Sequence, residues 1–255
     1  VARFPFDKFS DASNKLGTQM KATGEVMSIG RTMEESLLKA VRSLETGVCH
    51  IYHKKFDKWS NDDLLAYIKG GTDDRLYAIG QLIRNGVDLA LIYDKTKIDM
   101  FFLEKFKNIV EFENVVRAHP MDVETLRAAK RMGFSDKYIG QLWGLSQNEM
   151  YRLREKNNVF PVYKMIDTCA SEFASYVPYF YSTYEEENES IVSGKEKIIV
   201  LGSGPIRIGQ GVEFDYSTVH AIWSIRAAGY EAIIINNNPE TVSTDYTTSD
   251  KLYFE

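Results

Sequence analysis

The chain has 255 residues, of which 44% are hydrophobic and 26% charged, and its net charge is −5 at pH 7. This composition is that of an ordinary soluble protein with a real core, and the negative balance argues against general nucleic-acid binding. Cys49 and Cys169 are too few for a disulfide framework, and no apolar run approaches the roughly 20 residues that cross a membrane. We therefore expect a cytoplasmic protein. The lack of a signal peptide and of an initiator Met predicts the middle of a longer chain.

The first predicted elements are a strand over residues 24–30, which glycines flank, and a helix directly after it. Thr32 and Glu35 have the spacing of a capping box, and Gly47 ends the helix. Arg31, at the strand-to-helix junction, is either an anion contact or a solvated side chain.

Cys49, His50 and His53 invite interpretation as a metal site. A structural zinc site needs four ligands. The other candidates are scattered along the chain: His119, Cys169 and His220. We therefore predict no metal site and assign the first three residues to ordinary loop or strand positions.

Residues 60–157 have an almost purely helical pattern in short units, most of which begin with a capping residue and end at glycine. The predicted helices lie between Asn61 and Gly70, Thr72 and Gly86, Ile98 and Val116, Asp122 and Gly133, Ser135 and Gly144, and Ser146 and Asn157. Their irregular lengths argue against a solenoid repeat and predict a compact helical domain. Residues 87–93 are either a strand or an apolar linker.

Residues 134–156 have the pattern of a helix-turn-helix, with Gly144 at the turn. In a DNA-binding protein the second helix would enter a major groove, where Gln147 and Asn148 would contact bases. Basic residues outnumber acidic ones here: Lys130, Arg131, Lys137, Arg152, Arg154 and Lys156 against Asp136, Glu149 and Glu155. We favour an ordinary helical hairpin with solvated charges, because the basic, dimeric frame for DNA is missing.

Residues 160–184 are rich in aromatic side chains, and an acidic run follows them. Part of this set is expected to pack as a strip on a neighbouring surface: Phe173, Tyr176, Tyr179, Phe180, Tyr181 and Tyr184. Cys169 has no histidine near it in sequence that would activate a thiol, so we predict no nucleophile there. The polar residues 185–196 are predicted to connect two domains.

Residues 197–229 combine a strand, a glycine-rich loop and a helix. The apolar run 198–201 predicts a strand buried on both faces of a parallel sheet, and the helical pattern ends at Gly229. This geometry aims backbone N–H groups and a positive helix end at an anion. Residues 230–236 and 252–254 predict two further strands, as at the start of a nucleotide-binding fold. Three strands would leave an exposed edge, so we expect the unit to be disordered or covered by a partner chain.

The loop does not match the common nucleotide-binding motifs. Its glycines lack the G-x-G-x-x-G spacing, and the second strand ends in asparagines where a ribose-binding acid would stand. No Gly-Lys-Ser/Thr follows, so the loop is not a P-loop either.

Residues 201–216, LGSGPIRIGQGVEFDY, resemble the opening loop of the second synthetase half in the large subunit of the carbamoyl phosphate synthetase family. Further matches to this family are residues 238–246 and 248–250 just downstream, 24–32 at the end of its first ATP-grasp domain, and 162–164, 167–170 and 181–187 at the exit from its oligomerisation domain. The resemblance covers essentially the whole chain.

The resemblance implies a mainly α fold, in which a central helical oligomerisation domain precedes a truncated α/β Rossmann-like (pre-ATP-grasp) βαβ unit. It assigns residues 1–46 to the C-terminal tail of the first ATP-grasp (carboxyphosphate) domain. Residues 47–190 would be the oligomerisation domain with its aromatic and acidic connector, and residues 191–255 the start of the second half.

The resemblance also implies a ligase that makes carbamoyl phosphate from bicarbonate and glutamine-derived ammonia, for pyrimidine and arginine synthesis. The parent enzyme would use ATP with magnesium or manganese, and a glutaminase small subunit would supply the ammonia. The family's catalytic and metal-holding residues match nothing here. We therefore assign no catalytic residue, metal or cofactor to this segment, which would link the two halves, self-associate through its helices and be inactive alone.

One site is implied by the resemblance. In the family the glycine-rich loop borders the second active site and an inner passage for carbamate. The implied residues are Gly202, Gly204, Arg207, Gly209, Gln210 and Gly211. Glycines would either keep this passage open or only allow close packing of strand and helix. The alternative function is a helical DNA-binding or adaptor domain joined to a nucleotide-binding domain.

Overall fold

The computed structural model describes residues 1–9, 11–170, 172–173 and 177–255. The chain folds into two compact units. The sheet unit comprises Val1–Pro5, Ala22–Arg31 and Phe160–Glu255, and the helical unit comprises Phe6–Lys21 and Thr32–Val159. The predicted fold class, a helical domain followed by a small α/β unit, is confirmed. The two units are defined by packing, so the domain boundaries after residues 46 and 190 stay predictions.

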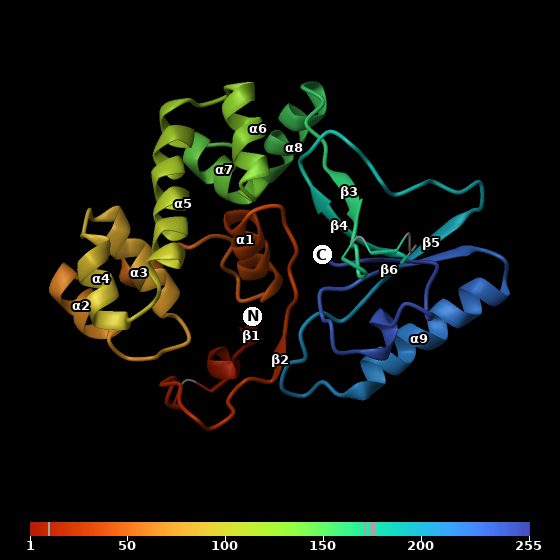
Figure 1. The fold of residues 1–255 in the computed structure, drawn as a ribbon, viewed down its shortest axis with the longest axis horizontal. Helices are drawn as coiled ribbons and strands as arrows, with labels where there is room; N and C mark the ends of the chain where they lie inside the picture. Colours follow the sequence, from red (N-terminus) through yellow and green to blue (C-terminus); the bar gives the residue numbers. More distant parts are fainter. Residues whose placement is uncertain (10, 171, 174–176) are drawn as a thin grey trace. The chain divides into compact units, whose positions relative to one another are not determined.

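The helical unit is built around one long helix, α5 (Met100–Ala118), drawn in yellow-green in Figure 1. It contacts α1, α3, α4, α6 and α7, and it buries Leu103, Ile109 and Val116 completely. The other helices of the unit are α1 (Met33–Ser43), α2 (Asn61–Ile68), α3 (Arg75–Arg84), α4 (Leu89–Thr96), α6 (Val123–Arg131), α7 (Asp136–Trp143) and α8 (Gln147–Lys156). No helix in the described part of the chain is both long and apolar enough to cross a membrane.

The helix starts follow the capping rules that the sequence indicated. Asp122, Ser135 and Ser146 each accept a hydrogen bond from a backbone N–H in the first turn of their helix, and Ser60 caps α2 one residue before the predicted start. Such caps satisfy backbone N–H groups that have no partner within the helix.

The prediction of a strand or linker over residues 87–93 is wrong, because this segment forms most of α4. The side chain of Asp88 accepts a hydrogen bond from the N–H of Ala90 and starts the helix. Ile92 is completely buried, whereas Leu91 and Tyr93 are exposed, so only one face of the segment enters the core. The short apolar run hid this helical period.

The sheet unit contains a five-stranded sheet in the order β3 (Val162–Met165), β4 (Tyr179–Thr183), β7 (Lys251–Tyr253), β6 (Glu231–Ile235) and β5 (Lys197–Leu201). Strands β5, β6, β7 and β4 are parallel, and β3 pairs with β4 antiparallel. Helix α9 (Val212–Ala227) connects β5 to β6 and packs on them, which confirms the predicted βαβ unit (Figure 1). A core cluster of the sheet unit comprises Ile222, Ala232, Ile234, Leu252 and Phe254.

The expectation that the first strand is buried on both faces is wrong for this chain. Strand β5 lies at one edge of the sheet, next to β6 alone. As a result Ile199 is 55% exposed and Leu201 is 74% exposed. The apolar run correctly predicted a strand, but a strand is covered on both sides only where other elements pack beside it.

The other edge of the predicted three-stranded sheet is covered by the chain itself. Tyr179 and Phe180 of β4 pair with Leu252 and Tyr253 of β7. Strands β3 and β4 were not predicted, because the aromatic pattern of this segment indicated a strip packed on a neighbouring surface. Phe180 and Tyr181 are indeed buried, whereas Phe173 is 72% exposed, so its predicted packing is wrong. Tyr176 lies outside the described residues.

The strand predicted over residues 24–30 is shorter than expected. Only β2 (Gly24–Glu25) is a strand, and it pairs antiparallel with β1 (Ala2–Arg3). Residues 26–31 continue as irregular chain within the sheet unit.

Candidate functional site

The glycine loop (residues 202–211) joins the carboxyl end of β5 to the N-terminus of α9. In open α/β sheets, ligands bind outside the carboxyl ends of the parallel strands. The loop therefore occupies the place where a site is expected. Gly209 has φ +86°, a conformation that glycine adopts readily and that strains other residues.

An asparagine cluster (Asn236 and Asn238) holds the start of this loop. The side-chain oxygen of Asn236 accepts hydrogen bonds from the N–H groups of Gly204 and Asn238, both at 3.2 Å. The side-chain amide of Asn238 donates to the carbonyl oxygen of Gly204 at 3.2 Å. Both asparagines are buried, so these bonds satisfy polar groups that water does not reach. The cluster ties the segment after β6 to the segment after β5.

Gly202 is required for this arrangement. A Cβ atom built at Gly202 would lie 2.5 Å from Cγ of Asn236 and 2.6 Å from its Nδ2. Because such contacts are far below van der Waals distance, any side chain at Gly202 would displace the asparagine. The glycine thus serves close packing against the second strand rather than approach of a nucleotide.

The first turn of α9 carries two acidic side chains, Glu213 and Asp215. Gly211 is the N-cap residue and supplies no side-chain cap. A Cβ built on Gly211 would lie 2.5 Å from Oε2 of Glu213, so this carboxylate lies next to the helix start. Asp215 accepts hydrogen bonds from the backbone N–H groups of Val242, at 2.8 Å, and Ser243, at 3.2 Å. A bound anion would meet two carboxylates here, so the sequence-based interpretation as an anion site is not supported.

A small open recess lies beside the loop. It has a volume of about 310 Å³, and its lining residues are Leu201, Ser203, Glu213, Phe214, Ser217 and Thr218. The hydroxyls of Ser217 and Thr218 donate to carbonyl oxygens of α9 itself, so they are already used. What remains for a ligand is the Glu213 carboxylate, the Ser203 hydroxyl and apolar surface. This lining does not suit a phosphate.

The structure separates the predicted site residues into two groups. Gly202 and Gly204 lie on the asparagine cluster, whereas Arg207, Gly209, Gln210 and Gly211 form the outer turn. In that turn the N–H of Arg207 donates to the side-chain oxygen of Gln210, and the N–H of Gln210 donates to the carbonyl oxygen of Arg207. The role of Asn236 and Asn238 was not predicted, because in the sequence they only showed that a ribose-binding acid is missing after the second strand.

The histidine and cysteine residues weighed as metal ligands do not come together. Within the described residues, no group of three or more histidine, cysteine or acidic side chains is placed to hold a metal ion. His50 lies in a loop, as predicted, and it is a buried partner of Glu113, with Nε2 3.0 Å from Oε1. Burial lowers the pKa of His50. Its ring stacks on Tyr138 at 3.7 Å.

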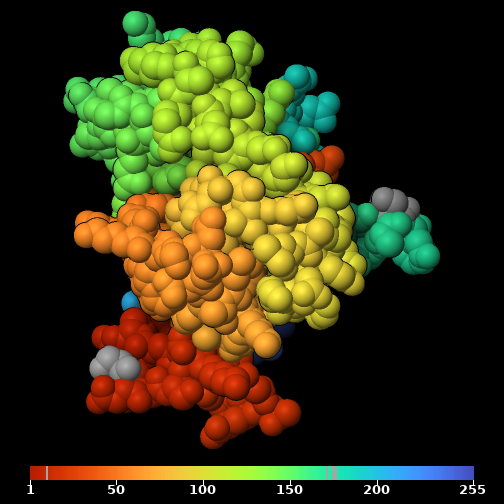
Figure 2. Space-filling model, turned by 90° about the vertical axis from the view of Figure 1, so that its left-hand side faces the viewer, coloured from red at the N-terminus to blue at the C-terminus, as the bar shows by residue number. Residues whose placement is uncertain are grey.

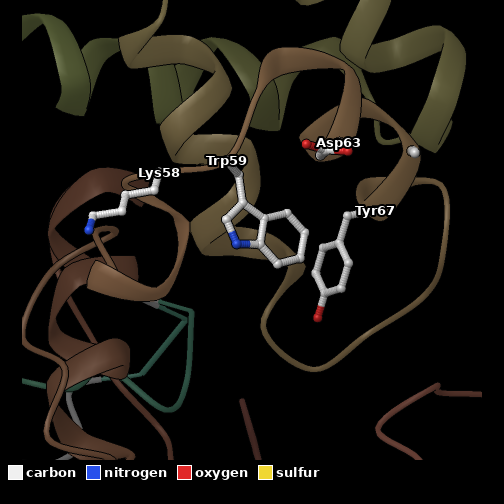
Figure 3. Close-up of a pocket in the computed structure, with 5 residues that line it drawn as sticks. Lys58, Trp59, Asp63 and Tyr67 are labelled. Atoms are coloured by element: carbon white, nitrogen blue, oxygen red, sulfur yellow. The ribbon is translucent and has the colours of Figure 1, made fainter.

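The helical unit has a pocket of its own, at the start of α2. Its volume is about 560 Å³, and it is lined by Lys58, Trp59, Asp63, Ala66 and Tyr67. Figure 3 shows the indole of Trp59 beside the ring of Tyr67, and the two ring centroids are 5.2 Å apart. Figure 2 shows the face of this unit on which residues of α2 to α5, in orange to yellow, reach the surface.

The helix-turn-helix pattern corresponds to a real helix pair, because Gly144 ends α7 in the left-handed conformation and Ser146 starts α8 with a full capping box. Its basic side chains, however, are not all on the surface. Lys130 and Arg154 are buried and both bind Asp136, at 2.9 Å and 2.8 Å. Two of the six basic side chains therefore serve the interior, which favours the helical hairpin.

Two family models match the chain. The first is described as "Carbamoyl-phosphate synthetase large chain, oligomerisation domain" and matches residues 25–158. The second is described as "Carbamoyl phosphate synthase preATP-grasp domain" and matches residues 194–255. The two matches follow one another along the chain, one over most of the helical unit and the other over β5 to β7.

Proposed function

Because this chain belongs to the carbamoyl-phosphate synthetase large-chain family, we propose that it connects the two synthetase halves of such a ligase and has no activity alone. The observation that carries this proposal is the order of the two matched domains. An oligomerisation domain over residues 25–158 precedes a pre-ATP-grasp domain over residues 194–255, which is the order expected between two catalytic halves. The parent enzyme would make carbamoyl phosphate from bicarbonate and glutamine-derived ammonia, with ATP and magnesium or manganese.

The glycine loop would then be a wall beside the second active site. Its start is held by the asparagine cluster, and the helix end behind it carries Glu213 and Asp215. These contacts support a rigid boundary that lets an intermediate pass and does not itself hold a nucleotide. The supply of ammonia by a small subunit, the cytoplasmic location and the use in pyrimidine and arginine synthesis belong to the same proposal.

Nucleotide binding by this chain is the direct test. Calorimetry with ATP and magnesium should give no binding, because both ATP sites would lie in the ATP-grasp domains of the parent enzyme. Binding in the micromolar range would contradict the proposal. An adaptor fused to a working nucleotide-binding domain would give that result.

The role of the loop is tested in the full-length enzyme with Gly211→Phe. A Cβ at Gly211 would meet the end of the Glu213 side chain, so a phenyl group there would displace this carboxylate and add bulk next to the loop. We expect more ATP to be hydrolysed per carbamoyl phosphate formed, since the intermediate would be lost between the halves. Gly194→Phe is the matched control, because nothing lies within 4 Å of a Cβ at Gly194. An unchanged ratio in Gly211→Phe would refute the passage.

The match to an oligomerisation domain supports self-association of the helical unit. Helices α4 and α5 expose apolar side chains that a partner would cover, among them Tyr93, Phe101 and Phe102. Light scattering over a range of concentrations should show a mass above that of the monomer. A strict monomer at high concentration would count against this role.

A further inference from the structure

A strap (residues 22–27) crosses the two segments that form the candidate site. It belongs to the sheet unit, although α1 of the helical unit follows it closely in sequence. Val26 is buried, and Met27 packs against the core cluster of β6, β7 and α9. The strap is thus part of the sheet unit's interior and not a loose linker.

The first contact of the strap is with the glycine loop. A Cβ built on Gly24 would lie 2.6 Å from the backbone nitrogen of Ile206 and 2.7 Å from its oxygen. These neighbours are main-chain atoms, which cannot rotate away as a flexible side chain would. Backbone of the strap and backbone of the loop therefore touch at a distance that only glycine permits.

The second contact is with the segment after β6. The N–H of Met27 donates to the carbonyl oxygen of Asn237 at 2.7 Å. Asn237 is buried, and in the sequence it stands between Asn236 and Asn238. This bond therefore fixes the backbone that carries both side chains of the asparagine cluster. Through Gly24 and Met27 the strap contacts both segments that the asparagine cluster ties together.

We propose that the strap is a positioning element, in which Gly24 and Met27 hold the glycine loop in its observed conformation. The inference rests on the proposed function only for what the loop does in catalysis, and the coupling of strap and loop is a property of this chain.

Native-state hydrogen exchange on the unaltered chain tests the coupling. The amides of Met27, Gly204 and Asn238 all donate hydrogen bonds within the strap, the loop or the asparagine cluster. If these segments form one cooperative unit, the three amides will open with the same free energy and the same denaturant dependence. If the Met27 amide exchanges while the other two stay protected, the strap is only packed on the surface of the unit and the inference is wrong.

Two variants add a directed test. Gly24→Ala should make the Gly204 and Asn238 amides exchange about tenfold faster or more, because the displaced loop loses bonds to the asparagine cluster. Gly17→Ala is the control, since nothing lies within 4 Å of a Cβ there. Met27→Pro removes the N–H donor and should have a similar effect, whereas Met27→Leu keeps both the donor and the apolar volume and should not.

Unchanged exchange at Gly204 and Asn238 in both Gly24→Ala and Met27→Pro would overturn the inference. Should either variant fail to fold, the experiment on the unaltered chain still decides. Exchange measures coupling within this chain, whereas ATP hydrolysed per product measures the role of the loop in the full enzyme. The inference and the proposed function can therefore fail separately.

Discussion

Asp136 forms ion pairs with two buried cations of the helical unit, Lys130 and Arg154. The Lys130 ammonium lies 2.9 Å from its Oδ1, and the Arg154 guanidinium donates to both of its oxygens at 2.8 to 3.0 Å. The side chains of Lys130, Arg154 and Asp136 are 7%, 10% and 13% exposed. This ion cluster joins the end of α6, the start of α7 and the end of α8.

The variant Asp136→Asn removes the negative charge and places an amide donor against one of the cations. Breaking a buried ion pair by loss of one partner costs about 3–5 kcal/mol, because an uncompensated charge stays buried. Both cations lose an ion pair with Asp136, while the hydrogen bonds of Lys130 to the Phe134 carbonyl and of Arg154 to the Val159 carbonyl remain and offset part of the cost. We expect the free energy of unfolding of the helical unit to fall by about 4 kcal/mol.

Urea unfolding followed by circular dichroism measures this change, with the denaturant slope as a check on two-state behaviour. Asp62→Asn is the matched control, because Asp62 also stands in the first turn of a helix but is exposed. The control should change stability by less than about 0.5 kcal/mol. A loss in Asp136→Asn below about 1 kcal/mol would refute the reasoning that burial makes this carboxylate indispensable.

Three further predictions concern the interior and the candidate site. Gly202→Ala should lower the melting temperature of the sheet unit, because the added Cβ displaces Asn236 of the asparagine cluster. Gly194→Ala is the control and should leave the melting temperature unchanged. Equal melting temperatures of the two variants would contradict the packing argument. Burial lowers the pKa of Lys130 from 10.5 to about 8, so between these pH values the unfolded state binds more protons than the folded state. The melting temperature should therefore rise with pH across this window. In Lys130→Met this rise should be absent. A hydrogen bond to Glu25 and its charge raise the pKa of Glu240, so the stabilisation from this pair is lost as pH rises through that pKa. Glu240→Gln should therefore raise the melting temperature more at about pH 7 than at about pH 4. An equal effect at both pH values would show that the carboxylates of Glu25 and Glu240 do not repel each other in the folded state.

The helical unit was the more predictable part of the chain because its signals are local. A cap such as Ser135 and a stop such as Gly144 lie within one short segment, so the sequence contains both ends of the helix. Helix α4 was not predicted, because its short apolar run has no clear period until the burial of Ile92 is known.

The sheet unit was less predictable because its pairings join distant segments. Strand β4 binds β7 from more than 70 positions away along the chain, and nothing in the aromatic segment indicates that partner. The candidate site has the same character. The glycines of the loop predicted a close approach, but the approaching groups are Asn236 and the strap, which come from two other parts of the sequence. Periodicity within one segment does not contain this information.

The contacts of the loop make it a poor match to a phosphate-binding loop, although it has the same order of strand, glycine loop and helix. A phosphate-binding loop needs N–H groups left open toward a ligand and a helix end free of negative charge. Here the Gly204 N–H is used by Asn236, and the start of α9 faces the carboxylates of Glu213 and Asp215. A phosphate would have to displace a buried amide and approach two like charges, and both costs exceed what one helix end provides. The shape of the loop therefore depends on the asparagine cluster and on the strap.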